Sequence, residues 1–363
     1  MPVEIKREGW LQLFTQMRNP NMFLTRMFTI KPGGSYNGDK VAIDIQRFDE
    51  DIAISIKKCT GPNLNDFDEF TTKEFEPPAY GEGFPLDVCD LLNRMAGVDP
   101  YTAAYTGYAA QLQAKMLLGF RLINDKIIRS VEVQASQILQ TGTLDLKDSA
   151  GNTTYSVDFK PKATHFPTVT TSWSTTATAD PLADLGALAK VIRTDGKVNP
   201  DRLIFGDTAF DNFLQNQKVL ERLDNRRMEL GGIAPAFEDS GATFQGFIWI
   251  GNYKFEMWSY PDTYKDPQTG LAVEYINPDN VVMMSSRARL DMTSARVPLP
   301  LGPDPRVASL LPGRMVSRTA GFDVTPNVYS TPNGKQIMGE LESRPLLIPV
   351  QIDAYGCLIT ETP

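Results

Sequence analysis

Residues 99–142 read DPYTAAYTGYAAQLQAKMLLGFRLINDKIIRSVEVQASQILQTG, and this stretch decides the fold. Asp99 followed by Pro100 is typical of a helix start, because the carboxylate caps free N–H groups and proline suits the first helical position. Thr141 followed by Gly142 is typical of a helix end. Between these limits, apolar residues at steps of three, four or seven indicate one amphipathic helix. The apolar positions are Tyr105, Tyr108, Leu112, Met116, Ile123, Ile127, Val131 and Ile138, and Lys115, Arg121, Asp125, Arg129 and Glu132 are expected on the other faces.

The length of this helix sets the shape of the molecule. At about 1.5 Å per residue, up to about 40 helical residues span roughly 60 Å. An average protein helix has only about 11 or 12 residues. Gly107 or Gly119 is the expected place for a break. Even with a kink, such a helix outreaches a compact domain and predicts a flat, elongated molecule.

Two segments before the helix lack a hydrophobic core of their own. Residues 1–40 form an apolar arm that needs a surface to lie on. Side chains then alternate between apolar and polar, which predicts strands at 41–46 and 52–57 and a returning strand at 70–75. Because isolated two-stranded ribbons are marginal in water, the ribbon also needs a partner surface, such as another subunit.

The pattern after the helix is mixed. It predicts a β-hairpin over 144–159 around a turn at 148–152, and a helix that starts at Asp180 and Pro181. Further along, it predicts a buried strand at 203–205, a helix from 210 to 227, a hairpin of 247–260 with 270–276, a strand at 281–284, an irregular Pro- and Gly-rich return over 298–335, and last strands at 346–352 and 357–359.

Composition excludes several functional classes. The 363 residues contain 36 basic and 44 acidic side chains, a formal net charge of −8, one histidine and three cysteines. No Lys- or Arg-rich run is present, which argues against a nucleic-acid reader unless folding assembles a basic patch. One histidine and the absence of a C-x-x-C pair argue against structural zinc. No apolar stretch reaches about 18 residues, no secretory signal is expected, and an odd cysteine count fits a reducing cytoplasm.

The search for catalytic groups finds none. His165 with Asp158 and Ser172 or Ser174 supplies the residue types of a hydrolase triad, but no Gly-x-Ser-x-Gly elbow presents a nucleophile, so a structural histidine is favoured. The acid clusters at 49–51, 66–69 and 238–239 are expected on solvated turns and lack the spacing of a calcium loop. The sequence therefore predicts no catalytic, cofactor-binding or metal site.

Short motifs spread along nearly the whole chain share their order and spacing with one family. They are Pro20 to Phe28 in the arm, Phe70 to Tyr80 at the end of the ribbon, Trp173 with Asp180 and Pro181, Val219 to Arg227, Pro278 to Met283, and Ser343 to Leu346. In these motifs the chain resembles the major capsid proteins of tailed phages, in the capsid protein E family of lambda-like major head proteins. The resemblance implies an α+β fold of the Hong-Kong-97-like capsid type.

The resemblance also implies a division of the chain. Its parts are an N-terminal arm (1–40), an extended loop or β-ribbon (41–78), a peripheral domain with a long spine helix (79–176), an axial domain (177–325) and peripheral-domain return strands (326–363).

By the same resemblance, the protein is expected to be a non-enzymatic, self-assembling head protein. It would form hexamers and pentamers of an icosahedral shell around double-stranded DNA, without sequence-specific binding, cofactor or membrane. Expected partners are further copies of itself and portal, scaffold and decoration proteins, in a virion capsid assembled in the cytoplasm of a bacterial host. The predicted subunit-interface residues are Phe23, Phe28, Ile52, Ile54, Ile56, Phe67, Phe70, Arg226 and Arg227, the last two with a plain charged helix face as the alternative.

Two rival functions remain at this stage. An encapsulin-type bacterial compartment has the same fold but carries an enzyme cargo instead of DNA. A carboxylate-dependent carbohydrate hydrolase would need two acids about 5 to 10 Å apart in a cleft.

Overall fold

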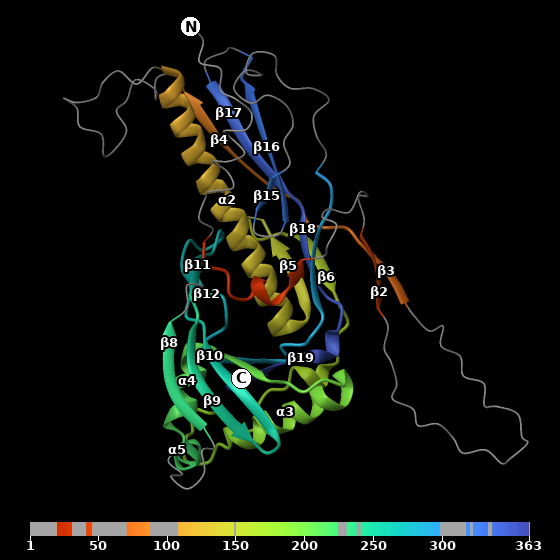
Figure 1. Ribbon diagram of the computed structural model, residues 1–363, viewed down its shortest axis with the longest axis vertical. Helices are drawn as coiled ribbons and strands as arrows, with labels where there is room; N and C mark the ends of the chain where they lie inside the picture. The colour runs from red at the N-terminus through yellow and green to blue at the C-terminus, as the bar shows by residue number, and fades with distance from the viewer. Residues whose placement is uncertain are drawn as a thin grey trace, which may run out of the picture.

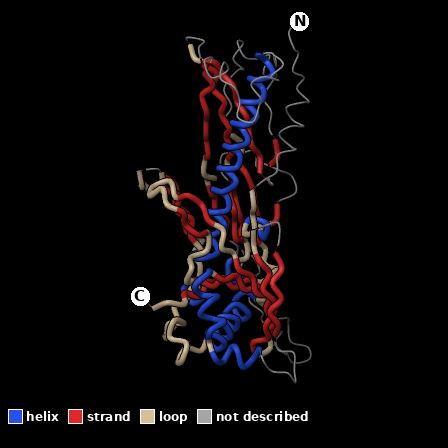
Figure 2. Tube along the Cα trace, turned by 90° about the vertical axis from the view of Figure 1, so that its left-hand side faces the viewer, coloured by secondary structure: helices blue, strands red, loops and turns tan. Residues whose placement is uncertain are grey.

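The computed structural model describes residues 20–30, 41–45, 71–87, 108–148, 150–223, 231–237, 241–297, 317–319, 322–332 and 336–362. The molecule is elongated, as the sequence predicts (Figure 1). Helix α2 (Tyr108–Thr141) runs along the long axis beside strands, and the other helices gather at the lower end (Figure 2). The protein therefore has an upper lobe built on α2 and a lower lobe built on the shorter helices.

Helix α2 has 34 residues and continues through Gly119, so the break expected there does not occur. Its predicted start at Asp99 and the other expected break, Gly107, lie outside the described residues. The predicted end is confirmed: Gly142 has φ +68°, a left-handed conformation that suits glycine, and its N–H donates to the carbonyl of Ile138 at 2.8 Å.

In the upper lobe, α2 packs on a four-stranded sheet in the order β15 (Ser317–Thr319), β16 (Phe322–Ser330), β17 (Gln336–Ser343) and β4 (Tyr80–Asp87). Phe84 of β4 is wedged between the helix and the sheet. A Cβ atom on Gly119 would lie 2.5 Å from the Phe84 ring, and one on Gly339 would lie 2.6 Å from it. The same ring meets Phe120 edge-on at 5.3 Å. Two glycines thus allow one aromatic side chain to join helix and sheet.

We expect Gly119→Ala and Gly186→Ala to change stability in opposite directions. Alanine is favoured over glycine inside a helix by about 1 kcal/mol. In α3 (Pro181–Gly196), a Cβ on Gly186 would make ordinary contact with Ile250 at 3.5 Å, so Gly186→Ala should raise the free energy of unfolding by up to about 1 kcal/mol. Gly119→Ala should lower it by about 1–3 kcal/mol, because the methyl group overlaps Phe84. Urea denaturation measures both, and a stabilised Gly119→Ala variant would contradict the wedge.

The lower lobe contains a six-stranded sheet that separates two hydrophobic cores. Leu203 and Phe205 of β7 face the core beneath α3, while Ile204 between them faces the core around α2. This alternation follows from the period of two in a strand. The strand order is β19 (Tyr355–Ile359), β13 (Asn280–Met284), β7 (Arg202–Phe205), β10 (Tyr253–Ser259), β9 (Thr243–Ile250) and β8 (Gly231–Phe237). The predicted strands at 203–205 and 281–284 are confirmed.

The prediction of one continuous helix from residue 210 is wrong, because Asn216 divides it into α4 (Asp207–Gln215) and α5 (Gln217–Leu223). The rest of the predicted range, 224–227, lies outside the described residues. The Asn216 backbone is extended, with φ −72° and ψ 127°. Its buried side chain donates to the carbonyls of Thr176 and Ala179, at 3.1 and 3.2 Å. These long-range hydrogen bonds compensate for the broken helix.

Two further predictions are corrected. The segment 247–260 does not pair with 270–276: β10 pairs with β9 through the turn at Gly251, where φ is +60°, and with β7. The residues 263–274 form their own ribbon, β11 (Thr263–Lys265) with β12 (Ala272–Glu274). The Pro-rich return contains the nine-residue strand β16, which tolerates Pro326 because β15 pairs only as far as Val324.

The remaining strands attach the appendages to the body. The predicted hairpin after α2 is confirmed as β5 (Thr143–Lys147) with β6 (Thr153–Asp158). In the arm, β1 (Thr29–Ile30) adds to a sheet with β14 (Leu290–Ser294) and β18 (Pro345–Pro349). The ribbon of β2 (Val41–Ile45) and β3 (Thr71–Phe75) lies beside the body, and the predicted strand at 52–57 is outside the described residues.

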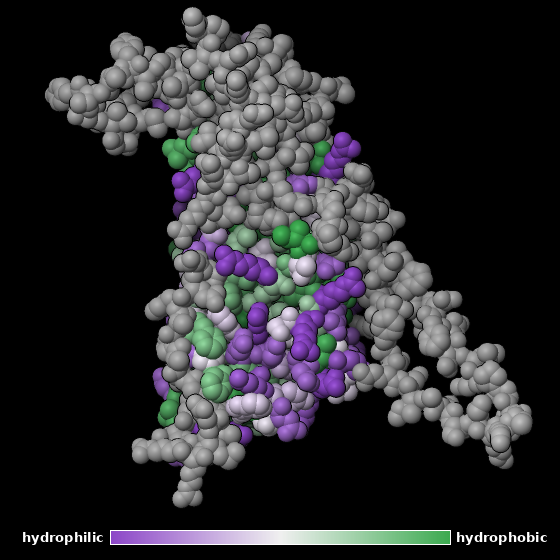
Figure 3. All heavy atoms as spheres, viewed as in Figure 1, coloured by the Kyte–Doolittle hydropathy of each residue, from purple (hydrophilic) through white to green (hydrophobic). Residues whose placement is uncertain are grey.

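The visible surface of the lower lobe is mostly polar. Figure 3 shows hydrophilic side chains over α3 and the neighbouring strands, with hydrophobic side chains in small separate groups. Within the described ranges, no helix is apolar over a length that would cross a membrane.

Candidate functional site

The N-terminal arm is held by one buried carboxylate on α2. Glu132 is 0% exposed, and its Oε1 accepts the N–H groups of Phe23 and Leu24 at 3.0 and 2.7 Å. Its Oε2 accepts the N–H of Thr25 at 3.0 Å and also the Thr25 hydroxyl. Tyr260 adds a fifth donor to Oε1, at 3.1 Å. The carboxylate thus caps the short helix η1 (Thr25–Met27) from another part of the chain, and we call this contact the arm latch.

Aromatic packing completes the arm latch. The Phe23 ring lies 5.3 Å from the rings of both Trp258 and Tyr260. Phe23 is 7% exposed and Phe28 is 3% exposed, both within the core of their own chain. The structure thus places these two predicted interface residues inside the subunit, because the arm folds back onto α2 and β10. Only small parts of their surfaces are left for a neighbour.

The electrostatics of the arm latch are set by burial. Loss of water raises the pKa of Glu132 above its usual range, and the hydrogen bonds from Thr25, Leu24 and Tyr260 oppose the rise. Burial, together with the adjacent Glu132 charge, also raises the pKa of Tyr260. Tyr260 therefore keeps its proton and remains a donor to Glu132 at neutral pH.

A buried arginine holds the base of the ribbon. Arg344 is 7% exposed, and its guanidinium donates to the carbonyl of Pro77 at 3.2 Å and to that of Arg296 at 3.4 Å. It also lies 3.8 Å from the Glu76 carboxylate, which is 62% exposed, so this ion pair adds little. Residues 76 and 77 connect β3 to β4, so Arg344 fixes the chain where the ribbon leaves the body.

The ribbon base has two further contacts. Phe75 packs on Phe159, with ring centroids 5.5 Å apart. Gln134 of α2 donates to the Tyr80 hydroxyl at 2.7 Å and to the carbonyl of Pro345 at 3.3 Å. The arm and the ribbon are therefore both anchored to α2 and to the strands beside it.

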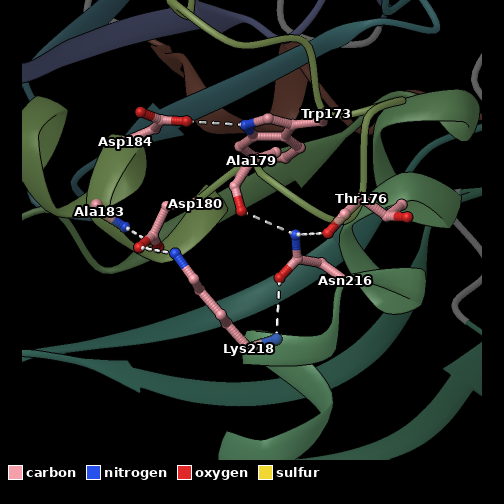
Figure 4. A network of polar contacts seen from close by, with 8 residues as sticks. All are labelled: Trp173, Thr176, Ala179, Asp180, Ala183, Asp184, Asn216 and Lys218. Atoms are coloured by element: carbon pink, nitrogen blue, oxygen red, sulfur yellow. Dashed lines mark hydrogen bonds and ion pairs between the residues drawn. The ribbon is translucent and has the colours of Figure 1, made fainter.

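A polar network gives a physical role to the Trp173 and Asp180 motifs (Figure 4). The buried Trp173 indole donates to Asp184 of α3 at 3.0 Å. Asp180 caps α3 by accepting the N–H of Ala183 at 3.1 Å, and Lys218 of α5 contacts its other oxygen at 2.6 Å. The Lys218 hydrogen bond lowers the pKa of Asp180, whereas burial raises that of Asp184. This network joins α3 and α5 around Asn216.

No hydrolase triad is assembled. His165 is 1% exposed, its Nδ1 lies 2.8 Å from the carbonyl of Tyr355, and its Nε2 lies 3.1 Å from Asp195. Asp158 instead pairs with Lys160 at 2.8 Å, and the Ser172 hydroxyl bonds to Ser174 at 2.7 Å. These contacts give His165 a structural role, as the sequence favoured.

The other groups with possible reactivity are the cysteine thiols and clusters of metal-binding side chains. Cys357 is a buried free thiol, and burial raises its pKa to about 12, so it is inert at neutral pH. Within the described ranges, no group of acids, cysteines or histidine has the arrangement of a metal site.

Several predicted residues cannot be compared with the structure. Ile52, Ile54, Ile56, Phe67, Phe70, Arg226 and Arg227 lie outside the described residues, as do the acid clusters at 49–51, 66–69 and 238–239. Sequence reasoning missed Glu132, which it assigned to a polar face of the helix. The available signal was an acid four residues after Ile128 and three before Ala135, inside the buried stripe.

Comparison with known families gives one match that covers almost the whole chain. A profile of the family described as phage major capsid protein E matches residues 11–355. No curated protein matches the chain closely enough in sequence to count as a relative.

Two solved structures are similar along nearly their full lengths. One is described as the capsid protein of a prophage of E. coli CFT073, with a TM-score of 0.64, 13% identity, and coverage of 98% of both chains. The other is a phage-related protein of Bordetella bronchiseptica RB50, with a TM-score of 0.50, 12% identity, and coverage of 97% of this chain and 96% of that one. At such low identity the similarity concerns the fold, and the capsid fold predicted from the sequence is confirmed.

Proposed function

Because this chain belongs to the phage major capsid protein E family, we propose that it builds the head shell of a tailed phage by self-assembly. Hexamers and pentamers of the chain would form an icosahedral shell around double-stranded DNA. The observation that carries the proposal is the family match over residues 11–355. The elongated body with a separately anchored arm and ribbon suits a tile that completes its packing on neighbours.

The domain division follows the same proposal, with two details from the strand pairing. The arm, ribbon, peripheral and axial parts correspond to the arm latch segment, β2 with β3, the α2 lobe and the six-stranded sheet. However, β16 crosses the expected boundary between 325 and 326 and pairs with β17 of the peripheral sheet. β19, from the final segment, pairs with β13 in the axial sheet. The C-terminal return therefore supports both lobes.

Partners and location are part of the proposal. Copies of the chain are the main partner, and portal, scaffold and decoration proteins are further ones. Assembly would take place in the cytoplasm of the bacterial host, and the finished protein would lie in the virion head. DNA would be enclosed without sequence-specific contacts, as the net charge of −8 suits.

Negative-stain microscopy after size-exclusion chromatography tests self-assembly of the full chain. We expect shells, tubes or capsomer rings. A chain that stays monomeric at high concentration, both alone and with the scaffold and portal proteins of its phage, would contradict the proposal. Particles that carry an enzyme cargo in place of DNA would favour the encapsulin alternative.

Ile54→Asp is expected to block shell formation and leave a soluble, folded subunit. The ribbon pattern puts Ile54 on its apolar face, where a neighbouring subunit would cover it, and burying a carboxylate there is unfavourable. Ser55→Asp is the matched control, because Ser55 lies on the opposite face of the predicted strand. Circular dichroism checks folding and microscopy counts particles. Normal shells from Ile54→Asp would remove Ile54 from the interface.

A further inference from the structure

The outward face of α3 carries a stripe of basic side chains. Lys190 and Arg193 are three residues apart in α3, so they share one face. Lys197 follows directly after the helix, where its φ is +55°, and all three residues are exposed. The helix has two acids, and both have partners elsewhere: Asp184 accepts from the Trp173 indole, and Asp195 contacts Lys162 and His165. The exposed stripe therefore has a net positive charge.

Neighbouring elements extend the positive charge around the C-terminal end of α3. Lys162 reaches Asp195 at 2.9 Å and keeps 40% of its side chain exposed. The side chain of Gln351 donates to the carbonyl of Gly196 at 2.8 Å, and its main-chain N–H donates to the carbonyl of Arg289 at 3.0 Å. These bonds bring the exposed Arg289 beside the helix end. The α3 basic face comprises Lys162, Lys190, Arg193, Lys197 and Arg289, with Asp195 as the carboxylate among them.

This concentration of positive charge stands out in a chain whose formal net charge is −8. Lys190 and Arg193 are about 4.5 Å apart along the helix axis, and Lys197 lies just past the helix end. The phosphates of duplex DNA supply one charge per about 1.7 Å of its axis, so several phosphates can face the stripe at once. Contacts made only by lysine and arginine to phosphates position a duplex without reading its bases.

We propose that the α3 basic face contacts the phosphate backbone of the packaged duplex DNA and lies on the inner side of the shell. This inference rests on the proposed function and adds to it the orientation of the subunit. Because few charges take part, binding is weak, and its salt dependence is set by the small number of phosphates contacted. Such contacts would hold the DNA weakly against the inner surface of the shell.

The test compares full-length subunits with a labelled 30-base-pair duplex of random sequence by fluorescence anisotropy over a salt series. Replacing Lys190, Arg193 and Lys197 together by Glu should weaken binding at least tenfold at low salt. It should also reduce the slope of log K against log salt by about 2–3, close to 0.9 per lost phosphate contact. The matched control replaces Arg121, Lys126 and Arg129, exposed on α2, by Glu, and should change binding less than threefold.

A second variant separates charge from folding. Glutamates near the C-terminal end of a helix oppose its dipole, so the triple Gln variant of Lys190, Arg193 and Lys197 is measured as well. It should retain the wild-type circular dichroism spectrum and lose most of the DNA affinity. Unchanged affinity in the triple variants, or equal losses in the α2 control, would overturn the inference.

Microscopy distinguishes this inference from the proposed function. The triple Gln variant should form shells like those of the wild type, with less co-purifying nucleic acid. If the wild type forms no shells, the proposed function fails, and the anisotropy measurements on subunits still test whether the α3 basic face binds DNA. If the variant forms no shells and binds DNA normally, the α3 basic face is a contact between copies and the inference is overturned.

Discussion

Replacing Glu132 by leucine is expected to release the N-terminal arm from α2 and to lower the free energy of unfolding by about 3–5 kcal/mol. The substitution removes the acceptor of three main-chain N–H groups and two hydroxyls. A leucine side chain leaves these buried donors without partners, and it cannot hold η1 against the helix. Glu132→Gln should cost about 1–3 kcal/mol, because its amide directs a donor at one of the donors of the arm.

Urea denaturation and limited trypsin digestion measure the two effects. Cleavage after the exposed Arg26 should be slow in the wild type and rapid in Glu132→Leu, because trypsin needs the arm to leave its site. Glu82→Leu is the matched control, since Glu82 of β4 forms an exposed ion pair with Lys126, which lies on α2 like Glu132. That pair is worth no more than about 1 kcal/mol. Equal effects of the two substitutions would contradict the arm latch.

Acidification is expected to tighten the arm latch. Burial raises the pKa of Glu132 in the docked state, whereas the released arm leaves an ordinary exposed carboxyl group. The docked state therefore binds the proton more tightly. Protonation of Glu132 therefore stabilises the docked arm. This stabilisation is complete below the pKa of an ordinary exposed carboxyl group and is lost as the pH rises through the raised pKa of docked Glu132. Hydrogen exchange over 20–30, corrected for intrinsic rates, should slow as pH falls, and Glu132→Gln should lack this dependence.

Replacing Arg344 by methionine is expected to free the base of the ribbon, at a cost of about 2–4 kcal/mol in the free energy of unfolding. Methionine fills similar space but leaves the carbonyls of Pro77 and Arg296 without their donor. Arg344→Lys should restore only part of the loss, because one ammonium cannot reproduce the fork of the guanidinium. Shell formation should also fail, because a ribbon with a free base cannot meet a neighbour in a fixed direction.

Hydrogen exchange of residues 71–87 and microscopy test this expectation together. Exchange should accelerate in Arg344→Met and remain unchanged in the control Arg129→Met, which removes an exposed arginine of α2. Normal exchange in Arg344→Met would show that Phe75, Tyr80 and Gln134 hold the ribbon base without the arginine.

The local patterns of the sequence were sufficient for much of the fold. The stripe of α2, the cap at Asp180 and the strands at 203–205 and 281–284 were all predicted, because helix and strand periods are properties of neighbouring residues. The family resemblance then supplied the capsid fold, through motifs whose role is clear only in the structure. Trp173 and Asp180, for example, are parts of one network that joins α3 to α5.

Other features depended on partners far away in the chain. Asn216 ends α4 because its amide reaches the loop before α3, and β10 pairs with β7 and β9 instead of the segment after it. Strand β16 forms despite its proline because β17 pairs with it from Val324 to Ser330. Each of these outcomes required knowledge of which segments meet, which no short window of sequence contains.

The candidate site follows the same division. The sequence by itself determined that the arm and the ribbon need surfaces, because their apolar residues exceed what they can bury alone. Only the tertiary structure decided that Glu132 holds the arm and that Arg344 holds the base of the ribbon. Glu132 meets Thr25 across 107 positions of the chain, and Arg344 meets Pro77 across 267. A charged residue becomes an anchor through the donors and acceptors that folding brings to it, and that pairing is fixed by packing over the whole chain.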